Sequence, residues 1–289
     1  MKHLDKNKPN RSKRSNDKSS DKSNDKSSDF NKPSRPKQRF KKPKLESVAP
    51  TNPNPRLNKY LANAGIASRR ASDELIRTGN VTINDKVVVE MGYRVQAGDV
   101  VKFKGKVVEA NVRKVYILMN KPKNTITTTN DPQGRKTVMT ILKNACDERI
   151  YPVGRLDRQT TGLLLFTNDG DLAKKLSHPS HKVKKIYHVF LDRKVSVHDI
   201  QKIGEGLELE DGLAEVDKVS YVQDKPKNEI GIEIHIGRNR IVRRIFEHLG
   251  YEVVKLDRVY YAGLTKKDIP RGMYRFLKPD EVRMMKYFV

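Results

Sequence analysis

One carboxylate in this sequence lies between two arginines, in the segment GRLDRQTTGLLLF. Asp157 has Arg155 and Arg158 close by, and a run of apolar residues follows at 163–166. Burial raises the pKa of a carboxyl group, whereas a neighbouring guanidinium favours the ionised form that a nucleophile needs. The same pattern is typical of a structural ion pair at a turn. The segment alone is therefore compatible with catalysis and with a purely structural role.

A second group of charged residues follows the alternating strand EIGIEIHI. The segment NRIVRRIFEHLG predicts a helix that is apolar on one side and carries charges on the other, namely Arg240, Arg243, Arg244 and Glu247. Such arginines form a solvated helix face, clamp phosphates or pair with a buried carboxylate. These three alternatives remain open from the spacing alone.

Several other chemistries are absent from the sequence. There is no GxxxxGK[ST] or GxGxxG motif for a nucleotide, no HExxH motif for zinc, and no Cys–His pair suited to thiol catalysis. His178 and His181 have a spacing that can bind a metal, but without an evident third ligand we interpret SHPSH as a polar loop. We therefore expect no cofactor and no metal.

The charge of the chain indicates a polyanionic partner. Sixty Lys and Arg against 35 Asp and Glu give a formal charge of +25, which favours nucleic acid. A membrane surface is the rival partner, but there is no apolar run of about 18 residues and no signal-peptide core. The single cysteine, Cys146, is consistent with a reducing compartment. We expect a soluble, monomeric, cytoplasmic protein.

Residues 1–55 form a low-complexity tail that we expect to be disordered. SNDKSSDK is followed by SNDKSSD, and the tail has 16 basic and 6 acidic residues, or +10. The remainder carries 44 − 29 = +15, so the rest of the chain is basic as well. The tail is either a solubilising segment or a weak electrostatic tether for RNA.

Two further units follow, over residues 56–112 and 113–289. In the first, helical spacing from Leu57 to Ala64, a Ser68 cap and a turn at Asn84-Asp85 predict two short helices and a β-hairpin. In the second, strands and helices mix without a regular βαβ order. This predicts an α+β fold around a mostly antiparallel sheet.

Both units resemble known families. RLNKYLANAGIASRRASDELIRTGNVTIN resembles the S4 RNA-binding domain. NKPKN, VGRLDRQTTGLLLFTNDGDLAKKLSHP, KKIYHV and GRNRIVRRIFEHLGYEVVKLDRV occur in the order seen in RNA pseudouridine synthases of the ribosomal branch typified by RsuA and RluB/E/F. TNDPQGRKTV is most similar to the large-subunit RluB type. The resemblance spans Arg56 to the C-terminus.

This resemblance implies a function and roles for individual residues. The chain would isomerise a uridine of rRNA, expected to be large-subunit rRNA, to pseudouridine without a cofactor. Asp157 would be the nucleophile, Arg243 its ionic partner, and Tyr187 the aromatic residue that stacks on the base; a packed strand aromatic is the bland alternative. Lys121 and Pro122 would shape the site wall. The residues assigned to RNA binding are Lys59, Arg69, Arg70, Lys121, Arg155, Arg158, Arg240 and Arg244.

The resemblance leaves two further points. Ile241 stands where many relatives have glutamine or glutamate, which removes a polar group but leaves Arg243 in place. The alternative function is a non-catalytic S4-type RNA-binding or ribosome-assembly factor. Because flipping a base costs least in a loop or single strand, we expect loop RNA as the substrate.

Overall fold

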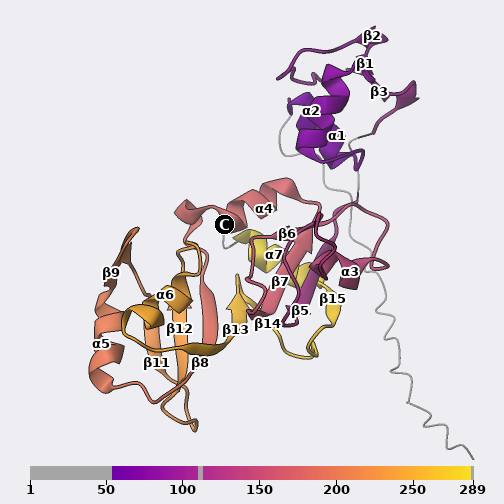
Figure 1. Cartoon of the computed structure of the whole chain (residues 1–289). Helices are drawn as coiled ribbons and strands as arrows, with labels where there is room; N and C mark the ends of the chain where they lie inside the picture. The colour runs from indigo at the N-terminus through magenta and orange to yellow at the C-terminus, as the bar shows by residue number, and fades with distance from the viewer. Residues whose placement is uncertain (1–53, 110–112, 288–289) are drawn as a thin grey trace, which may run out of the picture. The chain divides into compact units, whose positions relative to one another are not determined.

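The computed structural model describes residues 54–109 and 113–287 (Figure 1). The tail expected to be disordered, residues 1–55, falls almost entirely outside the described residues. Within the two described ranges, no helix combines the length and the apolar character needed to cross a membrane.

Residues 54–109 contain two helices and a small antiparallel sheet. The helices are α1 (Leu57–Asn63) and α2 (Arg69–Arg77), and the sheet has the order β2-β1-β3-β4, with β1 at Val81–Ile83, β2 at Lys86–Val87, β3 at Val101–Phe103 and β4 at Lys106–Val107. The Ser68 hydroxyl accepts a hydrogen bond from the amide of Ala71 (3.1 Å), which confirms the expected cap of α2. Asn84 and Asp85 both have positive φ and form the expected β1–β2 turn.

Residues 113–287 are built on a nine-stranded sheet (Figure 1). Its main path is β11-β12-β8-β13-β7-β5-β15, with β6 paired to β7 and β14 paired to β13. The strands are β5 (Tyr116–Lys121), β6 (Tyr151–Val153), β7 (Thr161–Thr167), β8 (Lys185–Leu191), β11 (Lys218–Tyr221), β12 (Glu229–Ile234), β13 (Val253–Tyr261), β14 (Leu264–Thr265) and β15 (Tyr274–Phe276). β9 (Leu207–Leu209) and β10 (Gly212–Ala214) form a separate hairpin. Among the described strands only β7 and β13 pair in parallel, so the expected mostly antiparallel sheet is confirmed.

Three of the five α-helices of this range begin at side-chain caps. The five helices are α3 (Val138–Leu142), α4 (Gly170–Ser177), α5 (Val197–Glu205), α6 (Ile241–His248) and α7 (Pro279–Tyr287), with a 3-10 turn at Pro179–His181. Thr137, Asp169 and Ser196 each accept a backbone N–H at the first turn of α3, α4 and α5. The chain leaves α6 at Gly250, whose φ of 78° suits a residue without a Cβ.

Strands β5 and β7 are buried on both faces, which explains the unbroken apolar run in GLLLF. Leu164 and Phe166 belong to one apolar cluster, together with residues of α3, α5 and α6. Leu163 and Leu165 belong to another cluster, together with residues of α4 and α7. A central strand covered on both faces cannot alternate apolar and polar residues.

The start of β7 approaches β13 so closely that position 162 requires glycine. Gly162 has a φ of 105°, and a Cβ there would lie 2.5 Å from the amide nitrogen of Arg258 and 2.7 Å from Oδ1 of Asp257. Both atoms belong to β13, where Arg258 pairs with Gly162 in the parallel register. A side chain would therefore push the two strands apart.

We expect Gly162→Ala to lower the free energy of unfolding by about 3 kcal/mol, because the backbone of β13 must move to admit a methyl group. Urea denaturation measures this loss. Gly134→Ala is the matched control: Gly134 also has a positive φ (65°), but no described atom beyond its chain neighbours lies within 4 Å of the place that a methyl group would take. That control should cost only about 1 kcal/mol. Equal losses at the two positions would show that the close approach of β13 is unimportant.

Candidate active site

Asp157 lies in the loop that joins β6 to β7, and its side chain is half-buried. Its backbone carbonyl accepts the amide of Thr160 (3.1 Å), which closes a turn around the carboxylate. The Thr160 hydroxyl lies 3.5 Å from Oδ2, a long hydrogen bond. The position of the carboxylate is thus set more by backbone hydrogen bonds of the loop than by hydrogen bonds to the carboxylate itself.

Lys121, at the end of β5, supports this loop from below. It is completely buried, and its Nζ donates to the carbonyls of Thr160 (2.8 Å), Asp157 (3.0 Å) and Pro122 (3.2 Å). Burial lowers the pKa of the Lys121 ammonium to about 8, although the charge of Asp157 acts in the opposite direction. The direct RNA contact suggested by the sequence does not fit a lysine with no exposed surface. Its expected role in shaping the site wall does fit.

The segment after β5 also fixes the Asp157 loop through its backbone. The amide of Asn124 donates to the carbonyl of Arg158 (2.9 Å), and the hydroxyl of Thr127 donates to the carbonyl of Leu156 (2.8 Å). Sequence reasoning missed Asn124 and Thr127. The NKPKN motif was the only sequence feature near them that suggested a role. Contacts to the backbone of a loop about 30 residues later produce no periodic pattern in the sequence.

Arg243 is a second buried cation of the site, beside Lys121. It projects from the side of α6 that the sequence marks as polar, yet only 7% of it is exposed. Its Nη1 donates to the carbonyl of Val253 (2.7 Å), while Nε is buried without a hydrogen-bond partner among the described residues. Burial and the charge of Arg240 lower the pKa of Arg243, and the charge of Asp157 raises it. Arg243 and Asp157 thus interact electrostatically, although within the described ranges no hydrogen bond joins them.

Tyr187 lies on β8, opposite Ile232 of β12 and Arg258 of β13. Its ring is buried in the same apolar cluster as Leu156 and Val242. Those two residues immediately precede Asp157 and Arg243 in the sequence. One core therefore positions the segments that carry all three predicted catalytic residues.

The residues assigned to RNA binding have different surroundings. Exposed side chains are found at Arg69, Arg70, Arg155, Arg158 and Arg240, and Lys59 on α1 is half-buried. Arg240 also pairs with Glu247 (3.0 Å). Arg244 makes a two-point ion pair with Asp211 at 2.9 and 2.8 Å, so its guanidinium is already engaged by a carboxylate.

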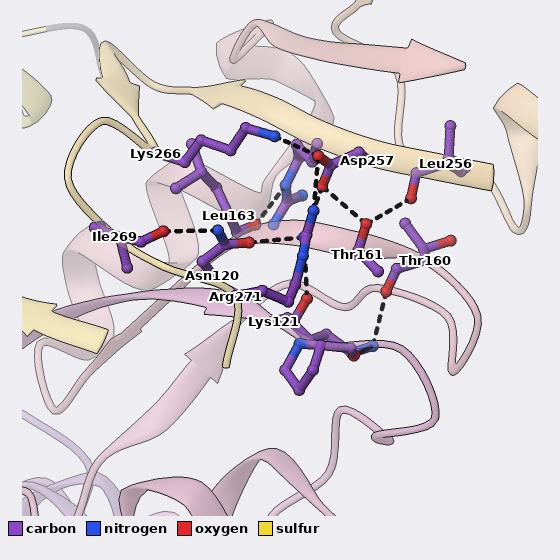
Figure 2. A network of polar contacts seen from close by, with 12 residues as sticks. Asn120, Lys121, Thr160, Thr161, Leu163, Leu256, Asp257, Lys266, Ile269 and Arg271 are labelled. Atoms are coloured by element: carbon purple, nitrogen blue, oxygen red, sulfur yellow. Dashed lines mark hydrogen bonds and ion pairs between the residues drawn. The ribbon is translucent and has the colours of Figure 1, made fainter. Parts of the chain in front are cut away.

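A buried carboxylate that sequence reasoning missed lies next to the site (Figure 2). Asp257 on β13 is 3% exposed and accepts both terminal nitrogens of Arg271, at 2.9 and 3.0 Å. Lys266 forms a short ion pair with the same carboxylate, and the hydroxyl of Thr161 donates to it (2.8 Å). Its neighbours in the sequence, KLDRV, gave no sign of three donors converging on one side chain.

The Asp257 carboxylate makes the stability of the fold depend on pH. Burial alone would raise the pKa of Asp257, but the bonds from Arg271, Lys266 and Thr161 lower it from 3.8 to about 2. A lowered folded-state pKa stabilises the fold above about pH 4, and this stabilisation, about 2 kcal/mol, is lost as the pH falls toward 2. In urea titrations between pH 6 and pH 2, the stability advantage of wild type over Asp257→Asn should therefore shrink as acid is added. An advantage that is constant across this range would contradict the assigned shift.

Comparison with known proteins places this geometry in a family. Residues 115–248 match the RNA pseudouridylate synthase family, and residues 55–101 match the S4 domain. The ribosomal large subunit pseudouridine synthase B of Bacillus subtilis is 42% identical over 234 residues, covering 80% of this chain and 95% of the relative. The chain belongs to the RNA pseudouridine synthase family.

Further matches describe this RNA pseudouridine synthase more closely. The dual-specificity RNA pseudouridine synthase RluF of Salmonella typhi is 36% identical over 234 residues, with 80% of this chain and 78% of the relative covered. A crystal structure of a pseudouridylate synthase is 25% identical with a TM-score of 0.58, and the match covers 80% of this chain and 99% of the other. The resemblance to the ribosomal branch with an S4 domain, the α+β pseudouridine synthase fold and the isomerase class are thereby confirmed.

Proposed function

We propose that this synthase converts one uridine of large-subunit rRNA to pseudouridine, with Asp157 as the nucleophile and no cofactor. The observation that supports this most strongly is the position of Asp157, in a loop held by buried Lys121 and within the electrostatic reach of buried Arg243. The Bacillus subtilis relative named as a large-subunit synthase supports the choice of rRNA.

The reaction needs no electrons from outside. The bond between C1′ and N1 of the uridine breaks, the uracil turns, and a bond forms between C1′ and C5. The proton on C5 is lost and N1 carries a proton in the product, so the atoms balance as an isomerisation. The carboxylate of Asp157 attacks the nucleotide and leaves again, as nucleophilic catalysis requires.

The neighbouring groups keep this carboxylate reactive. The positive charge of Arg243 interacts with the negative charge of Asp157, and the two would face each other in a site from which the bound substrate excludes water. Tyr187 would offer its ring as a stacking surface for the flipped uracil and its hydroxyl for proton transfer. Lys121 orients the loop through carbonyl oxygens and does not touch the substrate.

The RNA itself would be held by exposed cations around the loop. Arg155 and Arg158 are exposed on both sides of Asp157, so each is accessible to phosphates. Arg69 and Arg70 offer a second exposed pair in the S4 module. Flipping a uridine costs about a few kcal/mol and costs least in a loop or single strand, which favours an unpaired target.

The test is incubation of the purified protein with transcripts of both rRNAs, followed by chemical mapping of pseudouridine. We expect one modified position in the large-subunit transcript and none in the small-subunit transcript. Modification of the small subunit alone would overturn the substrate assignment. Binding without modification of either transcript, naked or partly assembled, would instead support the non-catalytic assembly factor.

A further inference from the structure

Strand β7, which follows the Asp157 loop, contacts one buried carboxylate on β13, that of Asp257 (Figure 2). Thr161 is the first residue of β7, directly after the loop, and its hydroxyl donates to Oδ1 of Asp257 (2.8 Å). The backbone of Asp257 also pairs with Thr161 across the β7–β13 ladder. Thr161, where the loop ends, is thus held to Asp257 both by a side-chain hydrogen bond and by the pairing of their strands.

Arg271 connects the same carboxylate to β5, which supplies the support beneath the loop. Its guanidinium binds Asp257 at two points, while Nη1 also lies 2.7 Å from Oδ1 of Asn120 and 3.4 Å from the carbonyl of Lys121. Asn120 in turn donates to the carbonyl of Ile269 (2.8 Å). The end of β5 is therefore held to the segment that carries Arg271.

Lys121 connects Arg271 to the Asp157 loop. Its backbone carbonyl faces Arg271, and its ammonium binds the carbonyls of Asp157 (3.0 Å) and Thr160 (2.8 Å). One chain of contacts runs from Asp257 through Arg271 and Lys121 to the backbone of Asp157. A second runs through Thr161 to the adjacent Thr160.

A contribution to stability alone is a weaker explanation of this network. A buried ion pair roughly balances its own desolvation cost, so apolar residues would stabilise the fold as well. What an ion pair with fixed hydrogen bonds adds is one defined geometry. Asp257 receives three donors, and two of them lead to the loop that presents Asp157.

We infer that Asp257, through Arg271, is a positioning residue that sets the placement of the Asp157 carboxylate for reaction. The inference rests on the proposed role of Asp157 as nucleophile. Asp257 itself touches no reacting atom and no RNA. Its removal should therefore slow the chemical step, through the altered placement of Asp157, and leave RNA binding unchanged. Displacement of a catalytic group by about 1 Å costs about 100-fold in rate.

The test compares Asp257→Asn with a matched control, Glu281→Gln. Glu281 makes a similar two-point pair with Arg275 (2.7 and 2.6 Å), but this pair connects β15 to α7 and has no described contact with the loop. On rRNA transcript under single-turnover conditions, Asp257→Asn should be slower by about 10- to 100-fold with a Kd within about twofold of wild type. Glu281→Gln should keep both values. Arg271→Lys, which keeps the charge but loses the two-point geometry, should lie between wild type and Asp257→Asn.

Amide hydrogen exchange supplies a readout that does not depend on activity. The amide of Thr160, which donates to the carbonyl of Asp157, should exchange about tenfold faster in Asp257→Asn and at the wild-type rate in Glu281→Gln. Wild-type turnover or unchanged Thr160 exchange in Asp257→Asn would overturn the inference. An inactive wild-type protein would overturn the proposed function instead, and exchange alone would then decide whether Asp257 holds the loop.

Discussion

Replacing Asp157 with asparagine should lower the rate of pseudouridine formation by at least about 10⁴-fold, the scale of losses when a nucleophile is removed. Asparagine has nearly the same shape but lacks the negative charge that attacks the nucleotide. The loop should keep its conformation, because Lys121 and Thr160 bind the backbone carbonyl of residue 157. Single-turnover assays on rRNA transcript measure the effect.

The same variant should fold and bind RNA normally. The only side-chain hydrogen bond of Asp157 among the described residues is the 3.5 Å contact from Thr160, so the free energy of unfolding should change by less than about 0.5 kcal/mol. Loss of modification together with loss of folding would not support a nucleophile. Retained modification would contradict the proposal outright.

The second large effect is expected from Arg243→Met, which should slow the reaction by about 10²- to 10³-fold, the range seen when one electrostatic stabiliser is removed. Methionine replaces a buried cation, and burial already lowers the pKa of Arg243, so its charge is costly to the fold. The free energy of unfolding should therefore change by no more than about 1 kcal/mol. Single-turnover kinetics and urea denaturation separate the two quantities.

Arg193→Met is the matched control for this substitution. Arg193 is exposed, but like Arg243 it donates to a backbone carbonyl, that of Gly250, and it also pairs with Asp192 and stacks on Tyr251, 4.6 Å from the ring centroid. We expect Arg193→Met to lose stability and to retain turnover. If Arg243→Met loses only stability, then Arg243 is a packing residue and not the partner of Asp157.

Local structure could be predicted from the sequence wherever one short segment decides it. Ser68 caps the helix that follows it, and Asn84-Asp85 turns the first hairpin, as expected. The alternation visible in KIYHVFL agrees with the strand, in which Tyr187, Val189 and Leu191 share one buried face. These features depend on spacing along the chain, which the sequence displays directly.

Features that depend on distant contacts were predicted less well. Lys121 is a residue type that commonly contacts RNA, but its ammonium is bound by carbonyls of a loop that lies more than 30 residues later in the sequence. Arg243 lies on the side of α6 that looks polar, and β13 nevertheless encloses it. Asp257 and Arg271 are ordinary charged residues until the sheet brings them together. Whether a charged side chain is buried depends on the strand or loop that packs against it, and the residues around it in the sequence do not reveal that strand or loop.

The central claim, that Asp157 catalyses isomerisation of an rRNA uridine, is tested most directly by pseudouridine mapping of rRNA from cells that lack this protein. The cells would be complemented with wild type or with Asp157→Asn at equal abundance. Our proposal predicts that a large-subunit pseudouridine disappears without the protein, returns with wild type and stays absent with Asp157→Asn. Its return with Asp157→Asn, or rRNA that is unchanged when the protein is missing, would contradict the proposal.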